Sequence, residues 1–346
     1  SCYFLSRSYL RVLRDAGPDQ IDSKLCLISD AGRPVAVVAA QLLTLEGGRL
    51  VANESTAEIP LAGIPARAKA LLTRVGRTAL KRMRRRVLVC GNLMSWGNHG
   101  VAFADGADEV RLWPAVAEAL YRIRNAEKLS GKTDYVLVKD LPSQTHQPVD
   151  ALKRFSYRPV ETDPDMVLEI RPGWKSFADY TNSLTSKYRS SIRKVEAETL
   201  QAGYEVVRVT DLVPLADRLG QLYSNVHQKA AVKPVTVPVQ YLPALAKAAG
   251  PDRFRCHVLK KGNEIAGFIT SLRSGTTAIG YYIGIDYQVN EQIPVYFRLL
   301  QQTVADAIEM GCERLSLGRT ALEPKAKLGA KPVPTRVWLR HRLPLM

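Results

Sequence analysis

The chain has 346 residues, of which 46% are hydrophobic and 24% charged, so it is long enough for two ordinary domains and is not a small disulfide-stabilised scaffold. Lysine and arginine number 49 against 33 acidic residues, and the net charge of +16 favours an acidic or polyanionic partner. The five scattered cysteines form no C-x-x-C pair, which predicts reduced thiols in a cytoplasmic protein and no metal site. No apolar run reaches the length of a membrane span.

Two segments 230 residues apart share a hairpin pattern. Residues 25–36 and 255–266 align with cysteine, glycine and alanine at matching positions. Each reads as a strand, a tight turn with glycine and a longer strand. This repeat predicts two mixed α/β domains in tandem, and a chance similarity of two hairpins is the alternative. A helix and a further strand are predicted after each hairpin, at residues 109–129, 135–138, 294–310 and 314–317.

Basic residues are concentrated between positions 67 and 86, the range from Arg67 to Arg86, where nine occur with no acidic residue. The apolar residues recur at helical spacing, which predicts a helix with its charges on the outer face. Such a face can follow the phosphates of a tRNA, but no aromatic residue is interleaved for base stacking. A solvated helix face is the alternative.

A glycine-rich segment follows the strand expected to end at Cys90. Residues 90–103 contain three glycines, with Trp96 and His99 among them. The segment either brings its backbone close to a ligand, so that Trp96 and His99 contact the substrate, or forms a long loop whose indole packs on the core.

Prolines mark the region between the two halves. They interrupt any long element, so we expect the boundary at residues 159–172, with domains at 1–160 and 161–346 and chemistry in the second. Two amphipathic helices are predicted next, at 185–201 and at 212–226, the latter with Asp211 as its N-cap. The prolines are Pro142, Pro148, Pro159, Pro164 and Pro172.

Basic residues without acidic partners occur at two further places. Arg189 and Arg193 lie one turn apart on the 185–201 helix, beside Lys194, and they repel each other unless an anion lies over them. Near the C-terminus, a strand end opens into a basic loop that contains Arg319 and Lys325. A solvated helix face and a solvated edge strand are the respective alternatives.

Familiar catalytic motifs are absent. The sequence has no phosphate-binding loop, dinucleotide fingerprint, H-E-x-x-H or G-x-S-x-G motif, which argues against nucleotide hydrolysis and serine hydrolysis. His227 lies one turn after Tyr223 and is either a general base near an acceptor or a solvated residue at a helix end.

Several segments together resemble one family. The S-K-x-R-x-x-I-R-K helix in residues 184–207, the Y-Y-I-G-I-D strand at 281–286 and the K-x-x-x-G turn at 325–329 resemble the second domain of FemAB-like proteins. These proteins form a BioF2-like branch of the GCN5-related N-acetyltransferase (GNAT) superfamily. The resemblance implies two GNAT-like domains in tandem, with mixed, largely antiparallel sheets and flanking helices.

The resemblance also implies a reaction, the transfer of an acyl group from a thioester or ester to an amine. The splayed strands that hold the carbonyl are expected at 266–272 and 278–283, with only one of two adjacent tyrosines facing the cleft. The residues expected to act in catalysis are Lys325, Tyr282 and His227; in donor binding, Arg189, Arg193, Lys194 and Arg319; in substrate binding, Trp96, His99, Tyr223 and Tyr281.

The donor is the least defined part of this expectation. GNAT enzymes hold the coenzyme A pyrophosphate on a glycine-containing loop, but residues 288–294 contain no glycine and include Glu291, so the usual mode of binding is not supported. We expect an N-acyltransferase with acyl-CoA as co-substrate, no tightly bound cofactor and a small-molecule or peptide amine as acceptor. The alternatives are an aminoacyl-tRNA-dependent transferase and a non-catalytic binding protein.

Overall fold

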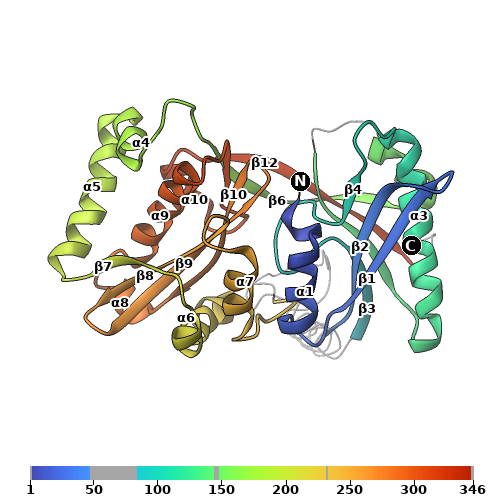
Figure 1. Ribbon diagram of the computed structural model, residues 1–346, viewed down its shortest axis with the longest axis horizontal. Helices are drawn as coiled ribbons and strands as arrows, with labels where there is room; N and C mark the ends of the chain where they lie inside the picture. The colour runs from blue at the N-terminus through green and yellow to red at the C-terminus, as the bar shows by residue number, and fades with distance from the viewer. Residues whose placement is uncertain (1, 47–83, 144–147, 231–232, 344–346) are drawn as a thin grey trace, which may run out of the picture.

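The computed structural model describes residues 2–46, 84–143, 148–230 and 233–343 (Figure 1). The first half of the chain contains α1 (Arg7–Ala16), β1 (Asp22–Asp30), β2 (Arg33–Glu46), β3 (Arg84–Cys90), β4 (Val101–Phe103), α3 (Glu109–Ala126), β5 (Tyr135–Pro142) and β6 (Arg158–Glu169). The described residues also form 3-10 helices at Tyr3–Leu5, Glu127–Ser130, Pro148–Phe155 and Val213–Leu215.

In the described part of the second half, four α-helices and an edge strand precede β8. The elements of this half are α4 (Phe177–Ser183), α5 (Ser186–Gln201), β7 (Glu205–Val209), α6 (Ala216–Lys229), α7 (Tyr241–Ala249), β8 (Phe254–Lys261), β9 (Glu264–Ser274), β10 (Thr277–Ile285), α8 (Tyr287–Asn290), α9 (Val295–Glu309), β11 (Arg314–Ser316), α10 (Leu322–Lys327) and β12 (Lys331–His341).

The described strands form one mixed sheet with a repeated order. The sheet runs β1-β2-β3-β5-β12-β6-β11-β10-β9-β8-β7, with β4 paired to β2. Read from its two sides, β1-β2-β3-β5-β12 and β8-β9-β10-β11-β6 have the same sequence of antiparallel, antiparallel, parallel and antiparallel pairs. In each set a long helix, α3 or α9, precedes the parallel strand. The expected mixed α/β fold with two similar halves is confirmed.

The predicted hairpins are the outer strands of these two sets. Strand β1 pairs with β2 and β8 with β9, and the turns contain Gly32 and Gly262, both with positive φ. The 212–226 helix is predicted too long at its start, because Pro214 favours a 3-10 turn at Val213–Leu215 and α6 begins only at Ala216. Asp211 therefore accepts the Val213 N–H over 3.0 Å and caps that turn.

The two halves are joined by exchanged strands rather than by a linker. Strand β6, which precedes the second half, pairs with β11, while the C-terminal β12 pairs with β5 of the first half. These two strands also pair with each other at the centre of the sheet, so the proline-rich region 159–172 is largely strand. Pro164 fits because it lies where the β6–β12 register is interrupted. The domain limits at 1–160 and 161–346 stay a prediction.

The splayed strands differ from those expected. Strands β9 and β10 are antiparallel neighbours, whereas β10 and the parallel β11 pair only over Thr277–Ile279 and Arg314–Ser316. A bulge between Gly280 and Ile283 interrupts the alternation of β10, so the rings of Tyr281 and Tyr282 lie 4.5 Å apart and line the same cavity. The expectation that only one of them faces the cleft is therefore wrong.

Candidate active site

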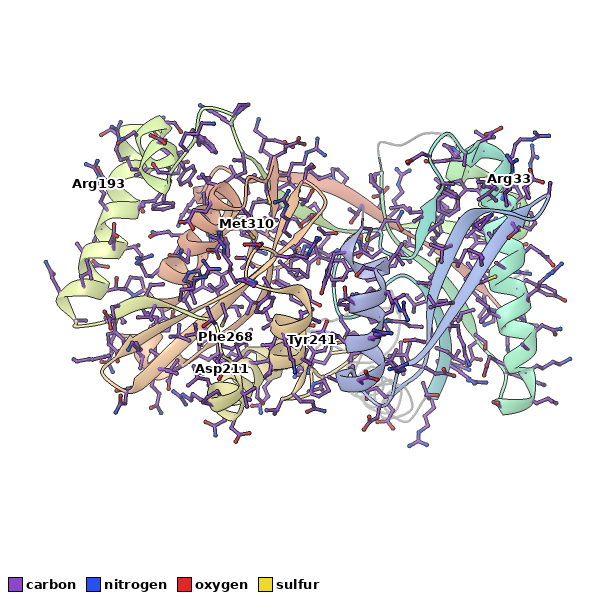
Figure 2. All side chains as sticks on the ribbon, viewed as in Figure 1. Arg33, Arg193, Asp211, Tyr241, Phe268 and Met310 are labelled. Atoms are coloured by element: carbon purple, nitrogen blue, oxygen red, sulfur yellow. The ribbon has the colours of Figure 1, made fainter. Side chains whose placement is uncertain are left out.

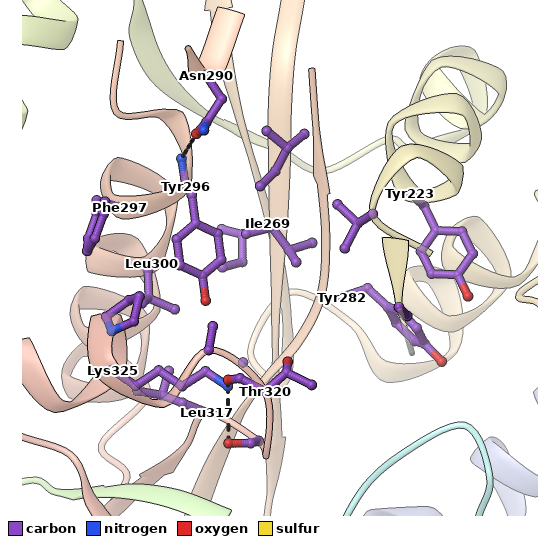
Figure 3. Close-up of a pocket in the computed structure, with 18 of the residues that line it drawn as sticks. Tyr223, Ile269, Tyr282, Asn290, Tyr296, Phe297, Leu300, Leu317, Thr320 and Lys325 are labelled. Atoms are coloured by element: carbon purple, nitrogen blue, oxygen red, sulfur yellow. Dashed lines mark hydrogen bonds between the residues drawn. The ribbon is translucent and has the colours of Figure 1, made fainter. Parts of the chain in front are cut away.

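A cavity of about 930 Å³ opens where β10 departs from β11. Helices α6 and α9 both pack against β9 and β10, and the close-up shows side chains of α9 and α10 on one side of the strands with Tyr223 and Tyr282 on the other (Figure 3). The cavity therefore reaches both faces of the sheet. Most of its wall is apolar or aromatic, including Trp96, Val226, Ile269, Tyr281, Ile283, Phe297, Leu300 and Leu317.

Lys325 lines this cavity as a buried residue of α10. Only 4% of its surface is exposed, and its ammonium donates to the carbonyl of Gly318 over 3.1 Å and to that of Thr320. Burial lowers the pKa of Lys325 to about 8, and the nearby carboxylate of Asp165 partly opposes that shift. The loop folds into a short helix instead of an edge strand, which removes the alternative of a solvated lysine.

Asp165 organises the loop that precedes α10. One carboxylate oxygen accepts the Gly318 N–H over 2.9 Å and the other accepts the Ser316 hydroxyl over 2.6 Å. Trp96 of the first half donates its indole N–H to the same Ser316 oxygen over 2.6 Å. Gly318 has φ of +78°, and a Cβ there would lie 3.1 Å from the Trp96 ring, so glycine is required on both grounds. Burial raises the pKa of Asp165.

Asp140 connects the cavity to the first half through a second set of charges. It is almost fully buried at φ +58° and pairs with both Arg319, which lines the cavity, and Lys139. It also accepts the Gly97 N–H over 3.0 Å, which fixes the glycine-rich segment. Burial lowers the pKa of Lys139, and its ammonium is held by Asp140 and by the Ser95 carbonyl at 2.7 Å.

Four side chains form a buried hydrogen-bonded chain that begins at the cavity wall. The Tyr281 hydroxyl lies 2.7 Å from that of Tyr241, which lies 2.9 Å from that of Tyr9, and Asn92 donates to Tyr9 over 2.7 Å. The labelled Tyr241 lies in the middle of the molecule (Figure 2). The chain thus links a cavity residue of β10 to the glycine-rich segment of the first half.

The other tyrosine of the pair is fixed differently. The Tyr282 hydroxyl donates to the carbonyl of Met94 over 2.9 Å, and burial raises the pKa of Tyr282 well above its usual value. The phenol therefore stays protonated, with its proton engaged by that carbonyl.

Tyr223 and His227 form the α6 side of the cavity. Their rings stack with centroids 5.2 Å apart, and the Tyr223 hydroxyl lies 3.2 Å from His227 Nδ1. The other ring nitrogen, Nε2, lies 3.2 Å from the Thr236 hydroxyl. The pair that the sequence places one helical turn apart is thus hydrogen-bonded at the cavity.

The four cations expected to bind the donor do not lie together. Arg319 and Lys325 line the cavity, but Arg189, Arg193 and Lys194 lie on α5, which packs against α9 at the outer side of the second half (Figures 1 and 2). Arg189 donates to its own helix start at the Leu184 carbonyl, Arg193 is exposed, and Lys194 pairs with Glu198. The physical reason is that α9 lies between α5 and the splayed strands.

His99 also lies outside the cavity. Its ring packs on Phe4 with centroids 4.2 Å apart, and its Nδ1 lies 3.2 Å from Cys2 Sγ. Burial, assisted by the charge of Lys139, lowers the pKa of His99 to about 4, so the ring is neutral at physiological pH. Trp96 of the same segment does line the cavity, which separates the two residues that the sequence groups together.

Residues 67–83 of the basic run lie outside the described residues, and only positions 84–86 can be placed. The three arginines that are described begin β3 as a strand rather than continuing a helix. Each is paired: Arg84 with Glu46, Arg85 with Asp134 and Arg86 with Glu127.

The segment before α9 lacks the geometry of a diphosphate site. Asn290 accepts the Tyr296 N–H over 2.9 Å, and the Val295 N–H is bonded to the Ile293 carbonyl over 2.8 Å. Two amides of the first turn therefore have partners within the chain, and Glu291 lines the same end of the cavity. The expectation that coenzyme A does not bind here in the usual mode stays a prediction.

The sequence reasoning missed several residues that build the site. Asp140, Asp165, Ser316 and Tyr241 carry no motif, since their partners lie far away in the sequence. Their only local signal is polarity inside otherwise apolar elements. Among the described residues, no helix is long and apolar enough to cross a membrane, and no group of side chains has the composition of a metal site.

Comparisons with known proteins match this fold. Residues 186–326 match a family model described as an acetyltransferase (GNAT) domain. FemX has a similar structure, with a TM-score of 0.56 and 10% identity over 98% of this chain and 92% of that one. L-PGS from Bacillus licheniformis is similar with a TM-score of 0.54 and 12% identity, over 98% of this chain and 93% of that one. A tandem GNAT protein from the clavulanic acid biosynthesis pathway is similar with a TM-score of 0.53 and 11% identity, over 97% of this chain and 88% of that one.

No curated protein sequence matched the chain. The family match confirms the expected recognition and the acyltransferase class, and the structural neighbours confirm the fold. Residues 186–326 therefore match the model of a GNAT acetyltransferase domain, within a chain whose fold is similar to those of FemX and of the tandem GNAT protein.

Proposed function

We propose that this protein is an N-acyltransferase that moves an acyl group from a thioester donor to a primary amine on a small molecule or peptide. The observation that carries the proposal is the cavity itself, which passes between β10 and β11 and joins the α9 face of the sheet to the α6 face. Two reactants entering from opposite faces meet at the divergence of the strands, which converts a bimolecular step into an effectively unimolecular one.

The reaction needs stabilisation of negative charge. The amine nitrogen attacks the thioester carbon, charge develops on the carbonyl oxygen, and the carbon–sulfur bond then breaks to release a thiolate. Lys325 supplies a buried positive charge at the cavity, where the low dielectric strengthens its effect. Its two carbonyl contacts fix its position before the substrate binds.

The reaction also releases a proton from the attacking amine. The Tyr223 hydroxyl lies at the cavity and is hydrogen-bonded to His227 Nδ1 over 3.2 Å. We assign the acceptance of this proton to the pair, with Tyr223 passing it to the imidazole. Tyr282 does not compete for this role, because its own proton is engaged by the Met94 carbonyl.

The donor is proposed to bind through its acyl end rather than through a diphosphate. Asn290 and Ile293 already accept hydrogen bonds from backbone N–H groups at the start of α9. We therefore propose that the nucleotide part of an acyl-CoA makes few contacts with the protein, so that its removal weakens donor binding little. We therefore expect S-acetyl-pantetheine and acetyl-CoA to give kcat/KM values within about fivefold of each other, a difference of about 1 kcal/mol.

The test combines donors, amines and variants. Acetyl-CoA, S-acetyl-pantetheine and a charged tRNA are each incubated with a panel of primary amines, and the acylated product is detected by mass spectrometry. Transfer from a thioester that falls about a hundredfold in Lys325→Met and in His227→Ala supports the proposal. If only the charged tRNA supports transfer, the donor is an aminoacyl ester, and the thioester donor proposed here is wrong. Binding of amines without transfer from any donor makes the protein a non-catalytic binder and overturns the proposal.

A further inference from the structure

A second cavity lies on the other half of the molecule. It has a volume of about 500 Å³ and is lined by residues of α3 and of the described end of the chain. Helix α9, which lines the first cavity (the acyl-transfer cavity), lies on the opposite side of the molecule from α3 (Figure 1). The lining residues of the second cavity include Tyr121, Arg124, Lys128, Lys132, Thr133 and Arg342. No acidic side chain of the described residues lines it.

The cations of this cavity are largely uncompensated. Arg124, Lys128 and Lys132 have no ion-pair partner in the described part of the chain, and Arg342 has a contact of 3.7 Å with Asp134. The two acidic residues nearby are already engaged. Glu127 pairs with Lys24 at 2.6 Å and Arg86 at 3.1 Å, while Asp134 pairs with Arg85 at 3.5 Å.

Like charges also act on one another here. Burial lowers the pKa of Arg124, and the neighbouring guanidiniums of Arg340 and Arg342 lower it further. An anion in the cavity would relieve this repulsion, which is the condition under which clustered cations become a binding site.

A buried hydroxyl supplies an independent observation. Thr133 is 3% exposed and lines the cavity, yet its Oγ1 has no hydrogen-bond partner within the described ranges. A buried hydroxyl without a partner costs free energy, and a ligand oxygen in the cavity would satisfy it. The cavity therefore combines positive charge with a wall residue, Thr133, whose buried hydroxyl has no partner among the described residues.

An aromatic ring lies beside these groups. Tyr121 is 47% exposed, and it precedes Arg124 by one helical turn on α3, so both lie on one face of the helix. Exposed tyrosine next to arginine and lysine is the combination that stacks on a base while neutralising a phosphate.

We propose that this cavity binds a nucleotide, with the phosphate on Arg124, Lys128, Lys132 and Thr133 and the base on Tyr121. The nucleotide is either free or part of a single-stranded RNA, because the cavity holds about one such unit and the chemistry of both is the same. This site is separate from the acyl-transfer cavity and does not depend on its function.

Calorimetric titration of the full chain with ADP, inorganic pyrophosphate and a short single-stranded RNA tests the proposal. The Arg124→Ala/Lys128→Ala double variant should bind ADP at least about tenfold more weakly, since a charge-assisted contact contributes about 1.5 kcal/mol or more. The control is Arg111→Ala/Arg122→Ala, which removes the same charge from α3 outside the cavity, where Arg122 is exposed and pairs with Glu118. Equal weakening in both variants would show nonspecific attraction and overturn the site.

Two further variants separate the parts of the proposal. Thr133→Val removes the unpartnered hydroxyl, so it should leave the unfolding midpoint unchanged or higher while weakening ADP and pyrophosphate alike. Tyr121→Ala should weaken the binding of ADP but not that of pyrophosphate, and an unchanged ADP affinity would overturn the base contact.

The ligands themselves separate the two sources of the nucleotide. If the RNA binds much more tightly than ADP through the same residues, the natural ligand is a strand, and equal affinities identify a free nucleotide. Absence of saturable binding to all three ligands would overturn the proposal.

Discussion

The indole N–H of Trp96 donates to the Ser316 hydroxyl oxygen over 2.6 Å, and that hydroxyl donates onward to Asp165 over 2.6 Å. Trp96 belongs to the first half of the chain, whereas Ser316 ends the strand at which the cavity opens. The first half therefore forms part of the cavity wall.

Replacing Trp96 by Phe should destabilise the protein by about 1 kcal/mol, because it removes this hydrogen bond while keeping an aromatic ring over Gly318. Chemical denaturation of Trp96→Phe, Ser316→Ala and the double variant measures the coupling between the two side chains. A coupling free energy near zero would contradict the interaction.

Lys325→Met should lower kcat about a hundredfold with little change in KM, because a charge that acts on the transition state contributes more there than to donor binding. Methionine keeps the buried volume of the side chain. The matched control is Lys327→Ala, since Lys327 is half-exposed, pairs with Glu323 and lies two helical positions away. Equal rates in the two variants would show that Lys325 only supports the loop.

The pH dependence should follow the lowered pKa of Lys325. Its charged form is required, so kcat should fall as the pH rises through about 8, and Lys325→Arg should keep its activity to higher pH.

The free energy of unfolding should change with pH in the opposite direction to kcat. The unfolded chain binds the Lys325 proton more tightly, so the free energy of unfolding rises between about pH 8 and the usual lysine pKa. Wild type and Lys325→Met, compared by denaturation at several pH values, should differ in that slope; identical slopes would contradict the shift.

Asp140→Asn should destabilise the protein by about 3 kcal/mol, because it leaves the buried ammonium of Lys139 without its counter-charge. Asparagine tolerates the positive φ of this position, so the change tests charge rather than backbone strain. Adding Lys139→Met should recover most of the loss. Arg319 also loses its partner, and donor KM should rise in the single variant.

Tyr241→Phe should cost about 2 kcal/mol, since the Tyr281 hydroxyl then lies buried without the partner it has at 2.7 Å. Thermal unfolding of this variant is compared with that of Tyr121→Phe, whose side chain is about half exposed and which should change stability by less than about 0.5 kcal/mol. Equal midpoints in the two variants would indicate that the tyrosine chain does not stabilise the fold.

The sequence alone determined the local elements. The spacing of apolar residues and the glycine turns are local signals, and they predicted both hairpins, α5 and α9 correctly. The resemblance to FemAB-like proteins pointed to Lys325, and the separation of one helical turn pointed to Tyr223 and His227. The structure places all three at one cavity.

Only the tertiary structure decided which of these residues meet. The exchange of β6 and β12, the bulge that turns both tyrosines into the cavity, and the position of α5 behind α9 depend on contacts between distant segments. Asp165 and Ser316 are 151 residues apart, and no local pattern encodes their hydrogen bond. The same holds for Lys325, because its charge is typical of a solvated loop until the packing of α10 buries it and shifts its pKa.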